Sequence, residues 1–169
     1  MLKLIVAASL SSFFFNLFGV DWDSVDQRIE KEYPRVEFIS TEQLYRAQDQ
    51  SQEVVPVVFD VRESEEFEIS HLESAINLKT GPEIAALITD KNAPIVVYCS
   101  IGYRSAGVAS ELEELGYTNV QNLRHSIFEW ADKDYPLISE QGDTDMVHPF
   151  NRVWGALLDK SLHQYSLRP

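Results

Sequence analysis

The chain has 169 residues and a formal net charge of -13, because 27 acidic residues outnumber 14 basic ones. This length suffices for one domain with a single hydrophobic core and additional segments. The acidic balance, without any cluster of Lys and Arg, argues against a nucleic-acid-binding protein, since phosphate binding needs clustered positive charge.

Cysteine and histidine are too few for most metal sites. The chain has one cysteine, Cys99, and four scattered histidines. This excludes an intrachain disulfide, a C-x-x-C redox pair and a thiolate-rich zinc or iron-sulfur site. The sequence therefore implies no metal and no organic cofactor, and any thiol chemistry depends on Cys99.

Residues 1–19 contain Lys3 near their start, followed by a strongly apolar run at 4–18. It is shorter than the roughly 20 residues of a membrane-spanning helix, but it suits the apolar region of a secretory signal. No clear cleavage site follows, so we interpret it as a signal peptide or an uncleaved membrane anchor, with a buried amphipathic helix as a third alternative. An exported, periplasmic or membrane-anchored protein is predicted, with membrane contact only if the segment is uncleaved; a cytoplasmic location is the alternative.

Residues 20–35 carry apolar side chains at helical spacing and end near Pro34. This pattern predicts a short amphipathic helix that packs on the following domain or leads into it. The apolar positions are Trp22, Val25, Ile29 and Tyr33.

Strands and helices alternate through residues 36–138. The run at 54–61 is apolar on both faces, as in a central parallel strand. The alternation predicts an α/β fold with a mainly parallel sheet and helices on both faces. Strands are expected at 36–39, 54–61, 75–78, 95–98 and 120–123, and helices after Ser40 and at 63–69, 82–89, 105–115 and 127–132.

Several charged or nucleophilic side chains lie directly at or after the ends of predicted strands. They are Asp60, Arg62, Cys99 and Arg124. Because ligands of parallel sheets bind outside the carboxyl ends of the strands, we expect these residues at one rim.

Cys99 lies where a predicted strand passes through a glycine-containing loop into a helix that we expect to begin near Ser105, its N-cap. The first amides of a helix lack intrahelical acceptors, and its dipole is positive at that end. These amides and the cation of Arg104 should lower the thiol pKa. A lone cysteine is more often a small buried hydrophobe, but this position favours a nucleophile.

Three blocks of sequence occur in a telling order: D-V-R-E at 60–63, E-F-E-I-S-H-L-E-S-A-I-N-L at 66–78, and I-V-V-Y-C-S-I-G-Y-R-S-A at 95–106. They resemble the recurring blocks of the rhodanese-like sulfurtransferases. Trp130 and Y-P-L at 135–137 resemble the closing segment of that family, so the likeness covers residues 36–138. The resemblance implies a five-stranded parallel sheet flanked by helices on both faces.

The resemblance also implies a chemistry in which Cys99 accepts a sulfane sulfur and carries it as a persulfide. A small sulfur-containing anion such as thiosulfate would be the donor, and a thiol, a protein or cyanide the acceptor. Arg104 would orient the donor, while loop amides hold the outer sulfur. The loop corresponds here to Cys99, Ser100, Ile101, Gly102, Tyr103, Arg104 and Ser105.

Other matched residues receive supporting roles. Asp60 corresponds to a position that supports the loop, although a satisfied strand-end carboxylate is at least as good an interpretation. Arg62 is interpreted as a structural ion-pair partner. Glu66 is expected to pair locally on its helix, and His71 to be structural rather than a catalytic base.

The chain departs from the family after the last strand, where His125-Ser126 replaces the usual Gly-Gly. Because glycine there permits a positive φ, histidine predicts a different or a strained turn. Our hypothesis is that Arg124 and His125 border the mouth of the site.

The C-terminal extension, residues 139–169, continues beyond this closing segment. Apolar residues at helical spacing, with Pro149 near the first turn, predict a helix that packs back on the domain. They are Phe150, Val153, Trp154, Leu157 and Leu158. No chemical role is assigned to this segment.

Two other functions compete with sulfur transfer. Cysteine-dependent phosphatases use C-x-x-x-x-x-R, but the spacing between Cys99 and Arg104 is one residue shorter. A rhodanese-like carrier, sensing or protein-binding module without turnover is the stronger alternative. The presence of Cys99, Gly102 and Arg104 together favours an active thiol.

Overall fold

The computed structural model describes residues 20–49 and 55–167. The apolar segment 1–19 lies outside the described residues, so its interpretation as a signal or anchor stays a prediction. Among the helices of the described part, none is both long and apolar enough to cross a membrane.

In the described part of the chain, five parallel strands form the main sheet in the order β1-β5-β4-β2-β3. All four residues of the central strand β4 are buried, which requires cover on both faces of the sheet. The predicted five-stranded parallel sheet is therefore confirmed. The strands are β1 (Glu37–Ile39), β2 (Val57–Asp60), β3 (Ile76–Asn77), β4 (Ile95–Tyr98) and β5 (Val120–Leu123).

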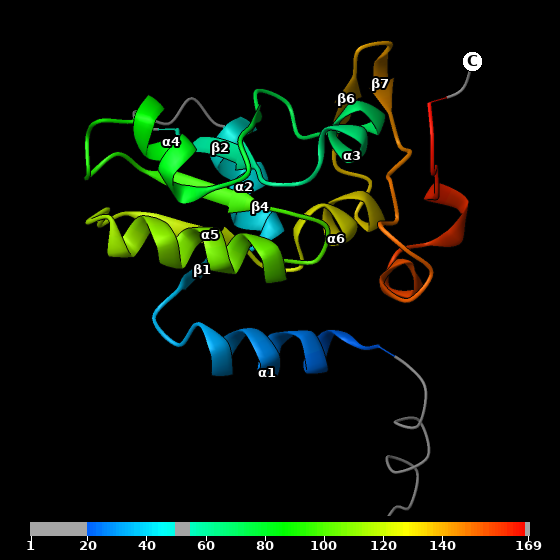
Figure 1. The fold of residues 1–169 in the computed structure, drawn as a ribbon. Helices are drawn as coiled ribbons and strands as arrows, with labels where there is room; N and C mark the ends of the chain where they lie inside the picture. The colour runs from blue at the N-terminus through cyan, green and yellow to red at the C-terminus, as the bar shows by residue number, and fades with distance from the viewer. Residues whose placement is uncertain (1–19, 50–54, 168–169) are drawn as a thin grey trace, which may run out of the picture.

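Helices connect the strands. α5 contacts both α1 and α4, and Figure 1 shows α1 running alongside α5, whereas α2 contacts α6. These contacts place the N-terminal helix against the helix that follows Cys99. The bounds are α1 (Trp22–Glu32), α2 (Thr41–Asp49), α3 (Ser64–Ile69), α4 (Gly81–Leu87), α5 (Tyr103–Glu114) and α6 (Ser126–Asp132).

Local capping explains where several helices begin. Before α2, the Gln43 amide N donates to Ser40 Oγ at 3.1 Å, and the Ser40 amide N donates to Gln43 Oε1 at 2.9 Å. This reciprocal pair is a capping box, which satisfies two amides at the helix start. Asp21 and Ser24 form the same arrangement at α1, whose Val25 and Ile29 are buried. The predicted amphipathic helix in residues 20–35 is present.

α5 begins earlier than the sequence pattern predicts. Its N-cap is Gly102, with φ 98°, and its first residue is Tyr103. Ser105 is therefore not the N-cap but a buried residue in the first turn. The reason is the left-handed conformation of Gly102, which glycine adopts without steric cost and which lets the chain turn into the helix at once.

The C-terminal extension differs from the prediction of an α-helix. An antiparallel hairpin of β6 (Leu137–Ser139) and β7 (Gly142–Thr144) leads into it, and two 3-10 helices follow, η2 (Trp154–Leu157) and η3 (Lys160–Leu162). Phe150 has φ 60°, and Asn151 Oδ1 accepts from the amides of Val153 and Trp154. The left-handed backbone of Phe150 cannot continue a right-handed helix, so the apolar run is divided at this residue.

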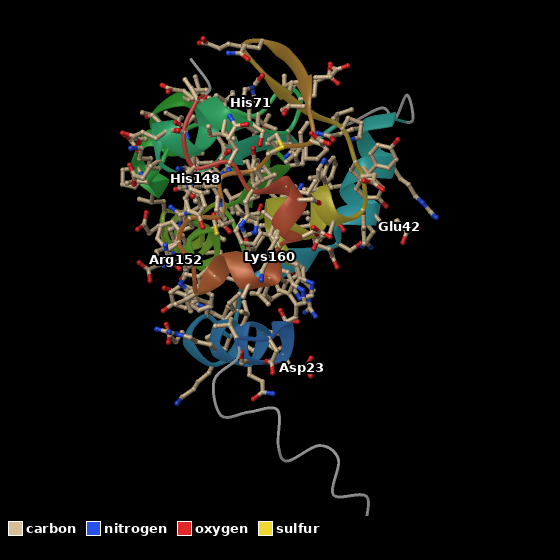
Figure 2. All side chains as sticks on the ribbon, turned by 90° about the vertical axis from the view of Figure 1, so that its right-hand side faces the viewer. Asp23, Glu42, His71, His148, Arg152 and Lys160 are labelled. Atoms are coloured by element: carbon tan, nitrogen blue, oxygen red, sulfur yellow. The ribbon has the colours of Figure 1, made fainter. Side chains whose placement is uncertain are left out.

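The extension nevertheless packs on the domain. Val147 and Leu158 are buried in the core, and Trp154 and Leu157 pack against it. The amide of Val147 donates to the Leu162 carbonyl at 2.8 Å, which ties η3 to the preceding segment. Figure 2 faces this side of the molecule and shows Arg152 and Lys160 on the extension.

Candidate active site at the Cys99 loop

Cys99 follows the central strand and is 1% exposed. The amide of Gly102 donates to Cys99 Sγ at 3.2 Å, and the amide of Cys99 donates to Ser126 Oγ at 3.1 Å. Asn122 Nδ2 donates to the Gly102 carbonyl at 2.8 Å. The loop is thereby fixed from β5 and α6, with an amide directed at the sulfur.

The electrostatic surroundings of Cys99 favour the thiolate. Burial raises the pKa of the thiol, but the positive charge of Arg104 and the polar groups of Ser105 and Ile101 outweigh it. The pKa of Cys99 therefore lies below its ordinary value. A thiolate is the form of cysteine that acts as a nucleophile. This arrangement agrees with the expectation from the loop sequence.

Arg104 is held by a carboxylate from α3. Its two terminal nitrogens, Nη1 and Nη2, donate to Glu66 Oε2 and Oε1, each at 2.8 Å. Ser100 Oγ also donates to Glu66 Oε1 at 3.0 Å. Such a bidentate pair fixes the guanidinium in one orientation. Burial raises the pKa of Glu66, but Arg104 outweighs it, so this pKa lies below the usual range.

Sequence reasoning missed this role of Glu66. The expected local pairing is real, because Glu66 Oε2 accepts from the amide of Glu63 at 3.1 Å. That bond is part of a capping box at the start of α3. The local pattern explains the glutamate completely, so nothing in it pointed to Arg104 on another element.

Asp60 and Arg62 form a fully buried ion pair at the end of β2. Arg62 Nη2 donates to Asp60 Oδ2 at 2.6 Å and to the Ser70 carbonyl at 2.6 Å. Burial opposes the positive charge of Arg62, but Asp60 outweighs it, and the pKa of Arg62 is raised. The pair joins β2 to the end of α3, which supports the structural interpretation. The ring of His71 stacks on the ring of Phe67, with 3.8 Å between the ring centroids. This contact supports a structural interpretation of His71 as well.

A pocket of about 220 Å³ opens onto the loop. Its walls combine the loop with two segments that are distant in sequence, α1 and the C-terminal extension. The guanidinium carbon of Arg104 lies 4.7 Å from the centre of the Phe150 ring. The lining residues are Arg28, Cys99, Ser100, Ile101, Tyr103, Arg104, Phe150 and Trp154.

The comparison with known protein families decides the assignment. The model of the rhodanese-like domain matches residues 40–133, which is more than half of the chain. The chain belongs to the rhodanese-like domain family. The fold agrees, because five parallel strands and a cysteine loop after the central strand are what the resemblance implied.

Relatives of this rhodanese-like domain include sulfurtransferases. Thiosulfate sulfurtransferase PspE of Escherichia coli is 38% identical over 66 residues, which are 37% of this chain and 64% of that protein. The chain thus spans less than two thirds of that relative. A thiosulfate sulfurtransferase structure from Pseudomonas aeruginosa has a TM-score of 0.60 at 20% identity. The match covers 72% of this chain and 23% of the Pseudomonas aeruginosa chain. A rhodanese-related protein from Thermoplasma volcanium has a TM-score of 0.52 at 25% identity, with 62% and 99% covered.

The match of the rhodanese-like domain ends before the extension begins, so part of the pocket comes from outside it. Arg28 belongs to α1, and Phe150 and Trp154 belong to the C-terminal extension. Arg28 Nη2 donates to the Tyr103 hydroxyl at 3.1 Å, and Glu32 accepts from the same hydroxyl. Sequence reasoning assigned none of these flanking residues to the site.

Arg124 and His125 do not line the pocket, and the expectation that they border its mouth is not met. Both side chains face α1 instead, where Asp26 Oδ2 lies 3.2 Å from Arg124 Nη1 and 3.3 Å from His125 Nε2. His125 also stacks on Trp22 at 4.2 Å. The acidic face of α1 attracts them away from the site.

Of the two alternatives that the sequence left open at this position, a different turn or a strained one, the structure has the strained turn. His125 has φ 57° and Ser126 has φ 49°, both in the left-handed region that glycine favours. Ser126 Oγ donates to the Leu123 carbonyl at 3.0 Å while accepting the amide of Cys99. The turn therefore helps to hold the Cys99 loop.

In residues 20–49 and 55–167, no group of three His, Cys, Asp or Glu side chains is arranged to hold a metal ion.

Proposed function

We propose that this protein is a sulfurtransferase that moves a sulfane sulfur from a small anionic donor such as thiosulfate to a thiol or cyanide acceptor. The carrier is a persulfide on Cys99. The observation that supports this most is a buried thiol with a lowered pKa, which accepts a backbone amide at the base of an open pocket. The named sulfurtransferase relatives support the same reaction class.

The first half-reaction is a nucleophilic displacement at sulfur. The Cys99 thiolate attacks the outer sulfur of thiosulfate, a new S–S bond forms, and the S–S bond of thiosulfate breaks with release of sulfite. The two negative charges of thiosulfate leave with sulfite, and the charge of the thiolate remains on the persulfide. No oxidant or proton is required.

The loop is suited to hold the product. A persulfide places its charge on the outer sulfur, and fixed amide dipoles stabilise an anion without reorganising. The amide of Gly102 already donates to Cys99 Sγ, and Arg104 supplies a positive charge that lowers the pKa of the thiol. In the second half-reaction an acceptor thiolate or cyanide attacks the outer sulfur, and the Cys99 thiolate is the leaving group.

Intact-protein mass measured before and after incubation with thiosulfate tests this function. The wild type should gain the mass of one sulfur atom, a reductant should remove it, and Cys99→Ser should gain nothing. If the wild type gains no sulfur while Cys99 remains free to react with an alkylating agent, transfer from thiosulfate is refuted. A carrier or binding module without turnover would then be the better interpretation.

A further inference from the structure

The pocket has aromatic walls that lie outside the family match. Phe150 and Trp154 come from the C-terminal extension and line the pocket together with Tyr103 of the loop. Phe150 keeps 42% of its surface exposed even though Arg104 stacks on its ring. An aromatic ring left partly uncovered beside a nucleophile offers contact area to an apolar group.

The cations of the pocket are already paired with carboxylates. Glu66 binds Arg104 through both of its oxygens, and Glu32 lies 3.0 Å from Arg28. The chain as a whole carries a net charge of -13. A small dianion that enters this pocket therefore finds loop amides but little uncompensated positive charge, and long-range repulsion opposes its approach.

We propose that Phe150 and Trp154 are specificity-determining residues, which favour a donor with an apolar body and one negative charge over an inorganic dianion. An organic thiosulfonate has this chemistry. The proposal rests on the proposed function. The size is adequate, because an apolar cavity of about 150 Å³ can hold a benzene ring and this pocket measures about 220 Å³.

The reaction with a thiosulfonate is balanced. The Cys99 thiolate attacks the terminal sulfur, the bond between that sulfur and the sulfonyl sulfur breaks, and the organic sulfinate leaves with the electron pair of the broken bond. One negative charge departs with the sulfinate and one remains on the persulfide. The organic group would lie against Phe150 and Trp154 while the reacting sulfur lies at the loop amides.

Single-turnover loading of Cys99, followed by intact mass on the full chain, tests the proposal. The donors are benzenethiosulfonate, methanethiosulfonate and thiosulfate, and the variants are Phe150→Ala, Trp154→Ala and the double variant. Val153→Ala is the control, because Val153 is a neighbouring apolar side chain that is 59% exposed and does not line the pocket.

The double variant should load benzenethiosulfonate about tenfold more slowly than the wild type, since each aromatic contact affects a rate constant severalfold. Its rates with thiosulfate and methanethiosulfonate should change less than about twofold, and Val153→Ala should match the wild type with every donor. The ratio of the rate in a variant to the rate in the wild type, taken for one donor at a time, cancels the different intrinsic reactivities of the donors.

Two results would overturn the proposal. If all donors slow equally in the aromatic variants, the extension supports the loop and does not select the donor. If benzenethiosulfonate loading is unchanged in Phe150→Ala, which removes a half-exposed ring and should fold, Phe150 makes no contact with the donor, and an unchanged rate in the double variant excludes contact with both rings. In both cases the proposed function stands, whereas failure of all donors to load wild-type Cys99 refutes both.

Discussion

Replacing Arg104 by methionine tests how the thiol is activated. Burial raises the pKa of Cys99, and the charge of Arg104 is the largest effect that lowers it. A neighbouring positive charge favours the ionised thiol. Arg104 is 31% exposed and also pairs with Glu66, but its removal takes away the main effect that opposes burial, so the pKa of Cys99 should rise in Arg104→Met.

The rate of alkylation by iodoacetamide as a function of pH measures this shift. Cys99 is the only cysteine of the chain, so the signal has one source, and the reagent is uncharged. At a pH below both pKa values, a higher pKa lowers the thiolate fraction and with it the alkylation rate, and each tenfold decrease in rate corresponds to about 1.4 kcal/mol less stabilisation of the thiolate.

A double variant separates the charge effect from a loss of structure. Arg104→Met alone leaves Glu66, whose side chain is 4% exposed, without its partner, which should lower the free energy of unfolding by about 2–3 kcal/mol. Arg104→Met/Glu66→Gln removes the unpaired charge and should regain most of this stability in urea unfolding, while the raised thiol pKa persists. An alkylation profile of Arg104→Met identical to that of the wild type would refute this reasoning.

Three further predictions concern the loop and its supports. Gly102→Ala places a side chain at φ 98° and should lower the free energy of unfolding by about 1–2 kcal/mol and slow sulfur loading; normal loading would contradict the role of this amide. Asp60→Asn leaves the buried Arg62 without its counter-charge and should cost about 3–5 kcal/mol in urea unfolding, whereas pairing it with Arg62→Met should recover much of this. Burial opposes the protonated form of His125, but Glu129 and Asp26 outweigh burial and raise the pKa of this side chain. Its contribution to stability is therefore complete below about pH 6.5 and is lost as pH rises through the higher folded pKa. Unfolding measured across this range should lose that pH dependence in His125→Gln, and an unchanged profile would assign it to another group.

Much of the fold could be predicted from local patterns. The strand at residues 95–98 has the predicted bounds in the structure. The helix predicted after Ser40 is present as α2, and Ser40 and Gln43 form a capping box at its start. These features act over a few residues, so the information that sets them is contiguous in the chain. The turn at His125 was predicted differently, from the departure from the family's Gly-Gly, and its positive φ matches the strained one of the two alternatives.

The two predictions of secondary structure that were wrong have a different origin. Helical spacing in the C-terminal extension predicted an α-helix, but the turn at Phe150 and Asn151 divides the segment into shorter pieces. The start of α5 shifted because Gly102 adopts a left-handed conformation. Spacing patterns record which side chains are apolar, but they do not record a single backbone angle or a competing side-chain bond.

The sequence by itself determined the strand, the thiol that follows it and the amides of the next turn, because hydrophobic periodicity and helix geometry are local. Tertiary structure decided which side chains surround that thiol. Glu66 approaches Arg104 from α3, Arg28 approaches Tyr103 from α1, and Phe150 covers the pocket from the extension. Contacts of this kind depend on strand order and on how distant segments pack. The local sequence around each of these residues does not indicate which distant residue it contacts.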